Sequence, residues 1–287
     1  MNRKPDPFLL DDNFASIVVG IKEGRLLFAN LKKSIAYTLT HLVPQMLPVL
    51  LWAFTGCPQP MTALLSVCID SLTELCPATS LAFEKPEANI MNVKPRNVKA
   101  DKLTNFTLLF YAYVVTGFGI TGGCYFTFFR IFSGYGISGS DLFSQNKRCF
   151  PSFDGRDYIA PSSGNTFTAD QQLDILHQVY AAWFIMIVAG QAIHIWFVRT
   201  TTVSIFEHGF FCNRYLNIGV FVALGLGCLV IYTPGIKEIV QANANDTQII
   251  ILQSSIMVAA YLVFVTEGRK YFTRHYPTHP LNKLLAW

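Results

Sequence analysis

Six long apolar stretches constrain the fold of this chain more than any other feature. A helix needs about 20 mostly apolar residues to cross a bilayer, and six stretches provide such a run, at 35–54, 61–83, 106–132, 175–198, 215–232 and 249–265. Hydrophobic residues make up 52% of the sequence and charged residues 14%, so the chain is too apolar for an ordinary soluble domain. We therefore predict an all-α fold, a polytopic membrane protein in which six transmembrane helices form a bundle in contact with the lipid bilayer.

The basic residues that flank these stretches predict the orientation, because short cytoplasmic loops carry an excess of Lys and Arg. An even number of spans places both termini on one side, and the basic flanks predict that this side is the cytoplasm. Residues 1–34 then form a cytoplasmic stalk, residues 35–266 the membrane domain and residues 267–287 a cytoplasmic tail. The long polar link at 133–174 faces the exterior.

The remaining composition excludes several other classes of protein. The excess of 22 basic over 18 acidic residues is small and scattered, which argues against a nucleic-acid partner. Seven cysteines are spread singly, five of them in apolar sequence, and they indicate neither a disulfide framework nor a zinc cluster. The N-terminus lacks a signal peptide's apolar core, so we expect the first span to insert as an internal signal.

Two carboxylates stand inside the second apolar stretch. Asp70 and Glu74 are four residues apart in CIDSLTELCPATS, on one face of a helix. An ionised group at this depth costs at least a few kcal/mol, so the pair indicates a cation. Pro77 removes a backbone hydrogen bond just after the pair, which predicts freed carbonyl oxygens as further ligands. The alternative is a protonated or hydrogen-bonded pair that only stabilises helix packing.

The first apolar stretch carries the polar groups that could face this pair. Pro44 and Pro48 predict local unwinding there. His41 and Gln45 share a helix face, and we expect them to meet Asp70 and Glu74 across the helical hairpin that the turn TGCPQP predicts. A lone histidine can equally be a hydrogen-bonded packing residue. The polar cluster consists of Tyr37, Thr38, Thr40, His41, Pro44 and Gln45.

Several stretches resemble the alpha subunits of the sodium/potassium and proton/potassium ATPases, which are P-type cation pumps. They are LLDDNFASIVVGIKEGRLLFANLKKSIAYTLT, CIDSLTELCPATSLAFEKPEANIM and KPRNVKADKL, and the pattern continues loosely to VFVTEGRKYFTR. The resemblance covers the whole chain unevenly. It implies the fifth to tenth membrane helices of such a pump, a stalk leading to a phosphorylation domain, a place in the plasma membrane, and potassium, sodium or protons as the transported cations.

The resemblance implies ion ligands as well as departures from them. Asp70 stands at the position of the family's central ion-binding aspartate and Glu74 at that of its second carboxylate, whereas His41, Leu42 and Gln45 replace a serine, an asparagine and a glutamate. Proton pumps of this type place a basic residue at the position of His41, where a built-in charge replaces one ion; a protonated His41 could do the same. The resulting candidate cation-binding residues are Asp70, Glu74, Gln45, Thr40, His41, Tyr37, Thr73 and Gln191.

Two further family sites match only in part. At the site of the extra sodium ion, Tyr37, Thr73 and Gln191 match, but His194 replaces an aspartate and Ala223 a glutamate. Ordinary three-for-two exchange is therefore in doubt. The run Ser162, Ser163, Gly164 and Asn165 partly matches the motif that grips a beta subunit, so the resemblance implies a beta-type partner.

The motifs DKTGT and TGDGxND, with which P-type pumps are phosphorylated and hold magnesium, do not occur in the sequence. We expect this chain alone to bind neither ATP nor magnesium and to hydrolyse no ATP. Three functions remain: a transport module with an altered ion site, a non-transporting relative that acts by assembly with a beta-type subunit or a full pump, and an independent channel. The channel is disfavoured, because nothing resembles a filter loop.

Overall fold

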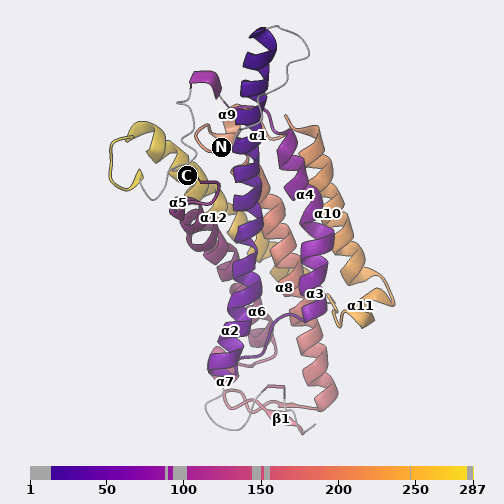
Figure 1. Cartoon of the computed structure of the whole chain (residues 1–287). Helices are drawn as coiled ribbons and strands as arrows, with labels where there is room; N and C mark the ends of the chain where they lie inside the picture. The colour runs from indigo at the N-terminus through magenta and orange to yellow at the C-terminus, as the bar shows by residue number, and fades with distance from the viewer. Residues whose placement is uncertain are drawn as a thin grey trace, which may run out of the picture.

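The computed structural model describes residues 14–87, 90–92, 102–143, 150–151, 156–245, 247–282 and 287. Within these residues six helices are long and apolar enough to cross a membrane, and they run along one another as a bundle (Figure 1). The prediction of an all-α bundle of six membrane helices is confirmed. The described start of the first helix and the C-terminus lie at one end of the bundle, called the terminal end below, and the 133–174 link lies at the other, the hairpin end.

The first span is one long helix with a single interruption at His41. It consists of α1 (Phe14–Thr40) and α2 (Leu42–Thr55), and Gly56 in the left-handed conformation ends it. The interruption precedes Pro44, which has no N–H for the carbonyl of Thr40 four residues earlier. The predicted unwinding at Pro44 and Pro48 is therefore wrong in position, because α2 continues through both prolines.

The second span is irregular at the carboxylate pair itself. It runs through α3 (Ala63–Cys68), the π-helical segment η1 (Ile69–Thr73), α4 (Leu75–Ser80) and the 3₁₀ turn η2 (Leu81–Phe83). The N–H of Glu74 donates to the carbonyl of Ile69, five residues back, at 3.0 Å. The backbone distortion thus includes Asp70 and begins before Pro77. Single π turns of this kind often occur at functional sites. The short 3₁₀ turn η3 (Ile90–Asn92) follows.

The third span also contains a π-helical segment. It comprises α5 (Phe106–Leu109), η4 (Phe110–Gly117) and α6 (Phe118–Gly134). A Cβ atom on Gly117 would lie 3.1 Å from the carbonyl oxygen of Thr40 and 2.6 Å from the Val43 side chain. The glycine therefore lets the third span approach the interruption in the first.

The link between the third and fourth spans holds the short helix α7 (Gly139–Leu142) and a two-stranded antiparallel sheet. Strands β1 (Tyr158–Ile159) and β2 (Thr166–Phe167) pair Tyr158 with Phe167.

The last three spans are α8 (Ala169–Val198), α10 (Arg214–Tyr232) and α12 (Gln248–His275), with the short helices α9 (Ile205–His208) and α11 (Ile236–Ile239) in the links. Thr168 and Gln171 form a capping box at the start of α8, and the Asn213 side chain caps α10. Helix α12 runs without interruption past residue 266, where the tail was predicted to begin. The predicted domain boundaries stay a prediction.

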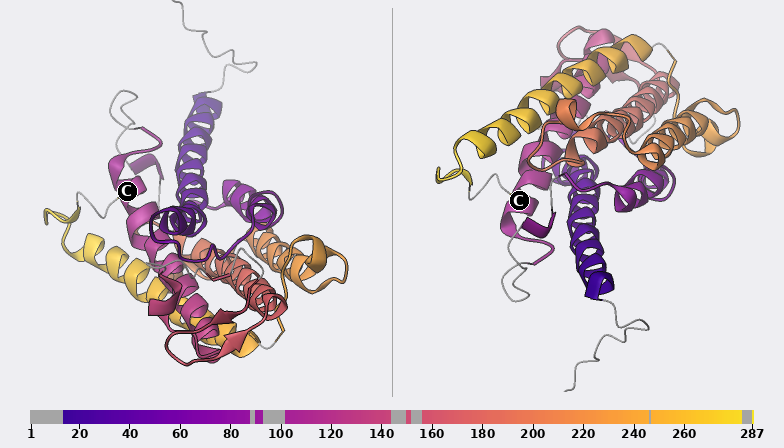
Figure 2. Two further views of the ribbon diagram at one scale, coloured as in Figure 1. Left: turned by 90° about the horizontal axis from the view of Figure 1, so that it is seen from below. Right: turned by 90° about the horizontal axis from the view of Figure 1, so that it is seen from above.

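Helix α8 is the centre of the bundle. It packs against α6 and α12 on one side and α10 on the other, and Figure 2 shows α12 and α10 on opposite sides of it. Trp183 in α8 is buried and donates its indole N–H to the carbonyl of Pro44 at 3.1 Å. This bond ties the central helix to α2 near the carboxylate pair.

Candidate functional site

His41 lies between the two intramembrane carboxylates. Its Nε2 atom is 3.1 Å from Oδ1 of Asp70, and its Nδ1 atom is 3.7 Å from Oε2 of Glu74. The amide of Gln45 donates to the same oxygen of Asp70 at 3.0 Å. The interruption between α1 and α2 thus faces the π turn of the second span. The structure brings together the four residues that were predicted to meet across the hairpin.

The two carboxylates have different surroundings. The side chain of Asp70 is 54% exposed, on a face of the bundle that no described helix covers, whereas that of Glu74 is only 5% exposed. Sequence spacing predicted only that the two carboxylates share one face of a helix, and their surroundings differ because the helix is π-helical at Asp70. One carboxylate is open to a ligand from outside the bundle, and the other is closed within it.

A small cavity adjoins Glu74 on the inner side. Tyr37, Thr73, Glu74 and Gln191 line it, with room of about 10 Å³, close to the space that one water molecule needs. The side chain of Thr73 donates back to the carbonyl of Ile69 at 2.9 Å. Three of the predicted ligands, Tyr37, Thr73 and Gln191, therefore lie together with Glu74, although they come from three different spans.

Several buried polar atoms around this cavity have no hydrogen-bond partner among the described residues. Such atoms are rare in folded proteins, because each one loses its bonds to water without replacement, and they commonly indicate bound water or an ion. They are Oε2 of Glu74, Nδ1 of His41, both side-chain polar atoms of Gln191 and both ring nitrogens of His194. The site therefore has unused coordinating capacity.

Thr40 does not join this group. Its hydroxyl donates to the carbonyl of Ala36 at 2.9 Å and lies 3.1 Å from the hydroxyl of Thr116 in the third span. The role of Thr40 as a cation ligand stays a prediction, and its side chain lies on the side of α1 that packs against η4.

Of the two residues that depart from the family pattern, one lines this cavity and the other lies next to Tyr37, which lines it. Ala223 of α10 lines it, and His194 of α8 is fully buried, with its ring 6.1 Å from that of Tyr37. Neither residue supplies the carboxylate oxygen that a hard monovalent cation would prefer there. This part of the site is poorer in anionic ligands than the part at Asp70 and His41.

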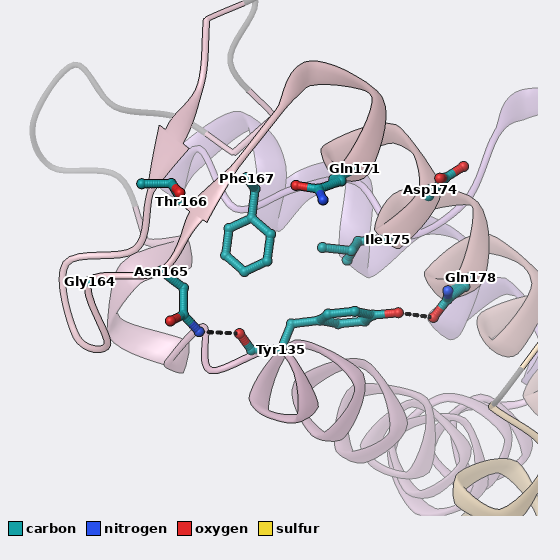
Figure 3. Close-up of a pocket in the computed structure, with 9 residues that line it drawn as sticks. All are labelled: Tyr135, Gly164, Asn165, Thr166, Phe167, Gln171, Asp174, Ile175 and Gln178. Atoms are coloured by element: carbon teal, nitrogen blue, oxygen red, sulfur yellow. Dashed lines mark hydrogen bonds between the residues drawn. The ribbon is translucent and has the colours of Figure 1, made fainter.

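The run Ser162, Ser163, Gly164 and Asn165 forms the exposed turn between β1 and β2, where Gly164 has a φ of 74°. Asn165 donates its side-chain N–H to the carbonyl of Tyr135 at 3.2 Å, and the hydroxyl of Tyr135 donates to Gln178 at 2.9 Å (Figure 3). The turn is therefore fixed to the ends of α6 and α8. It offers an open recess at the hairpin end.

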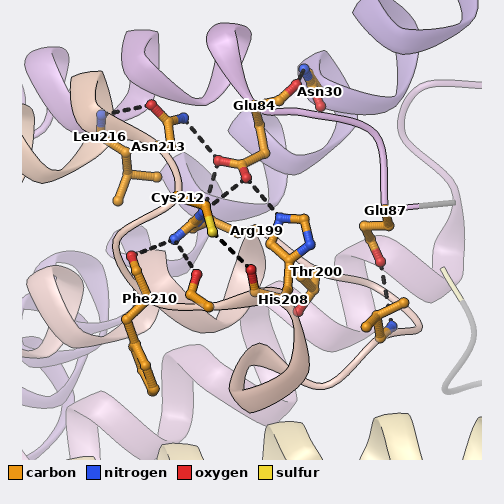
Figure 4. A network of polar contacts seen from close by, with 12 residues as sticks. Asn30, Glu84, Glu87, Arg199, Thr200, His208, Phe210, Cys212, Asn213 and Leu216 are labelled. Atoms are coloured by element: carbon orange, nitrogen blue, oxygen red, sulfur yellow. Dashed lines mark hydrogen bonds and ion pairs between the residues drawn. The ribbon is translucent and has the colours of Figure 1, made fainter.

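A buried polar network at the terminal end was missed by sequence reasoning. Glu84, which follows η2, accepts two parallel hydrogen bonds from Arg199, at 2.9 and 3.0 Å, and one from Asn213 at 2.8 Å (Figure 4). His208 lies 3.1 Å from the same carboxylate. Arg199 was interpreted only as a basic flank that indicates orientation, yet its side chain is fully buried. Its position at the end of an apolar stretch was the only signal.

Glu87 forms a second polar network beside that of Glu84. It pairs with Lys33 of α1 at 2.7 Å and accepts backbone N–H groups from Thr201 and Thr202 at 2.8 and 3.1 Å. Burial alone would raise the pKa of Glu87, but the charge and hydrogen bond of Lys33 and the two backbone donors outweigh it and lower that pKa to about 2. The pKa of Glu84 is shifted in the same direction. Burial raises this pKa, but the hydrogen bonds from Arg199 and Asn213 outweigh burial and hold it below the usual range.

The fold and the site together define a class of protein. A bundle of six membrane helices with paired carboxylates at a distorted helix near its middle is the arrangement of an integral membrane protein that handles cations. The chain matches the family model described as "Cation transporting ATPase, C-terminus" over residues 58–272. It belongs to this family, and it is a C-terminal membrane region of a cation-transporting P-type ATPase.

Its relatives include long pump subunits. The chain is 39% identical over 232 residues to a sodium/potassium-transporting ATPase subunit alpha of Hydra vulgaris, which covers 81% of the chain and 22% of that protein. It is 34% identical over 279 residues to a potassium-transporting ATPase alpha chain 2 of Cavia porcellus, which covers 95% of the chain and 26% of that protein. The chain therefore spans about a quarter of the length of the curated relatives it matches.

Proposed function

We propose that the chain is the cation-transport module of a sodium/potassium-exchanging type of pump, with an altered ion site. The observation that carries this proposal is the contact of His41 and Gln45 with Asp70, beside Glu74, at the two helix irregularities. Carboxylate, amide and hydroxyl oxygens are the ligands of hard cations such as potassium and sodium. The names of the relatives support these two ions, and protons are a third candidate.

The position of His41 supports a built-in charge. A protonated imidazole between two carboxylates would compensate one negative charge and replace one monovalent ion. The missing anionic groups at His194 and Ala223 point in the same direction, because they weaken the second part of the site. We propose that this module binds fewer cations in each cycle than one with a neutral residue at position 41.

Turnover tests this proposal in a pump whose corresponding region is replaced by this chain. Asp70→Asn should abolish cation-stimulated ATP hydrolysis, because it removes the charge that the cation neutralises. Cys76→Ala is a matched control on the same span, since Cys76 is exposed and contributes no ligand in this proposal. Equal losses from both substitutions would reduce the carboxylates to a packing role.

ATP hydrolysis belongs, in this proposal, to other parts of the pump. The sequence contains neither the phosphorylated-aspartate motif nor the magnesium-binding motif. The purified chain should therefore form no acid-stable phosphoenzyme with ATP and magnesium, and its formation would contradict the proposal.

Orientation and assembly complete the proposal. We propose that both termini lie in the cytoplasm of a plasma-membrane protein and that the turn of residues 162–165 faces outside, where a beta-type subunit would bind its exposed polar edge. A tag after residue 287 should be reached by antibody only in permeabilised cells. If transport fails but a beta-type subunit still copurifies, the second candidate function gains support, namely a non-transporting relative that acts through assembly.

A further inference from the structure

The carboxylates Glu74 and Glu84 stand at the two ends of one helical rod. Glu74 immediately precedes α4, and Glu84 immediately follows η2, so residues 75–83 connect the candidate cation site to the polar network at the terminal end. The rod is about 14 Å long at the usual helical rise. We therefore expect a change in how Glu84 is held to be transmitted along the rod to Glu74.

We infer that Arg199 is a positioning residue for the cation site, acting through Glu84. This inference rests on the proposed function and adds the element that fixes the geometry of the site. We call the residues around this carboxylate the Glu84 clamp. The clamp consists of Glu84, Arg199, Asn213, His208 and Asn30.

The clamp gathers four parts of the chain on Glu84, three of them on its carboxylate and one on its backbone carbonyl. Arg199 comes from the end of α8, His208 from α9 and Asn213 from the start of α10. Asn30 of α1 donates to the backbone carbonyl of Glu84 at 2.7 Å. Figure 4 shows these side chains converging on Glu84. The bidentate geometry of Arg199 fixes direction as well as distance, because its planar N–H groups match both carboxylate oxygens.

The rod itself is held on two sides between its ends. The hydroxyl of Ser34 in α1 donates to the carbonyl of Ala78 at 2.8 Å, and Asn213 reaches the carbonyl of Ser80 at 3.3 Å. On the α10 side, a Cβ on Gly219 would lie 3.1 Å from the carbonyl oxygen of Cys76. These contacts hold the middle of the rod and the clamp holds its terminal end, so both together position Glu74.

A buried ion pair of this kind contributes more to geometry than to net stability. Removing two charges from water costs desolvation free energy, which offsets much of their Coulombic attraction. Replacing both partners by apolar residues therefore often leaves the protein equally stable. Side chains that hydrogen-bond the ligands of a bound ion commonly change its affinity 10–100-fold when removed, and we expect the low end of that range here, because residues 75–83 lie between the clamp and the site. Stability and cation affinity can therefore be separated by the choice of variant.

The test uses the full chain in lipid nanodiscs with thallium(I), a monovalent ion that substitutes for potassium. Arg199→Met leaves Glu84 unpaired, whereas the double variant Arg199→Met/Glu84→Gln also removes the buried charge. The matched control is Arg274→Gln, which breaks an exposed ion pair with Glu207. Thallium affinity, the thermal midpoint, and the maleimide labelling rate of Cys76 relative to Cys228 are measured for each variant.

If Arg199 is a positioning residue, the double variant should recover stability without recovering thallium affinity. Its thermal midpoint should return most of the way to that of the wild type, while thallium affinity stays about tenfold weaker and Cys76 labelling stays altered. The control should match the wild type in all three measurements. Wild-type affinity in the double variant would overturn the inference and leave the proposed function intact. If the wild-type chain binds no thallium, the proposed function fails, and unchanged Cys76 labelling in the clamp variants would then overturn the inference separately.

Discussion

The candidate cation site and the Glu84 clamp are both buried clusters of charge, but they satisfy their polar atoms differently. In the clamp, both carboxylate oxygens of Glu84 accept hydrogen bonds and only 1% of the side chain is exposed, although Oδ1 of Asn30 has no partner among the described residues. In the cation site, Asp70 is half exposed, and Glu74, His41 and Gln191 each retain an atom without a partner among the described residues.

This difference separates a structural network from a binding site. A cluster that only stabilises the fold gains by pairing every atom, because an unpaired buried group costs free energy. A cluster that binds and releases an ion must leave ligand atoms unused in its absence. The unpaired atoms at Glu74 and Gln191 therefore support an ion-binding role, and the fully paired carboxylate of Glu84 supports a structural role.

The largest expected effect comes from breaking the clamp. Arg199→Met should lower the free energy of unfolding by about 3–5 kcal/mol, because Glu84 would keep a buried charge without its main partner. Asp70→Asn should cost less than about 1 kcal/mol, since Asp70 is half exposed. Equilibrium unfolding in mixed micelles, followed by tryptophan fluorescence, measures both. Equal losses would remove the distinction between the two clusters.

The second-largest expected effect is a loss of unfolding free energy on acidification, from Glu87 at the terminal end. Glu87 has a pKa of about 2 in the folded chain against a usual 4.5, so its contribution is complete above pH 4.5 and is lost as the pH falls toward 2. Between pH 5 and pH 3 this amounts to about 2 kcal/mol of unfolding free energy. Unfolding midpoints at the two pH values should differ less in Glu87→Gln. A variant as pH-sensitive as the wild type would place the loss elsewhere.

A substitution at the cavity should act in the opposite direction on stability. Gln191→Leu removes two buried polar atoms that have no partner among the described residues, so the free energy of unfolding should rise by about 1 kcal/mol. Thallium affinity should fall in the same variant, because an amide ligand is lost. Lower stability together with unchanged affinity would show that Gln191 is structural.

The smallest effect is expected at the exposed pair of Arg274 and Glu207. Solvent screens this contact, and Arg274→Gln should change the unfolding free energy by less than about 0.5 kcal/mol. The same unfolding experiment measures it. A loss comparable to that of Arg199→Met would mean that burial does not distinguish the two ion pairs.

The sequence predicted the six spans because burial in lipid demands long apolar runs, whatever the tertiary packing. It also predicted that His41 and Gln45 meet Asp70, since a short turn joins their helices and intramembrane charges need partners. It did not predict the π turn at Asp70 or the direction of Thr40, because both depend on helix rotation. Apolar periodicity cannot resolve this when helices are apolar on every side.

The pairing of Glu84 with Arg199 was equally beyond the sequence. The two residues are 115 positions apart, and each reads as an ordinary charge at the end of a span. Only the packing of α4 between α1 and α10 brings the end of α8 to Glu84. Charges at span ends are therefore ambiguous between orientation signals and buried partners until the bundle is assembled.

Thallium(I) binding to the full chain in nanodiscs shows whether the carboxylate cluster binds a cation. We expect saturable binding in the wild type, loss of binding in Asp70→Asn, and at least one additional bound ion in His41→Ser, because the serine no longer supplies a built-in charge. Cys76→Ala should bind as the wild type does. Absence of saturable binding, or equal binding by the wild type and Asp70→Asn, would contradict the claim that this carboxylate cluster is a cation site.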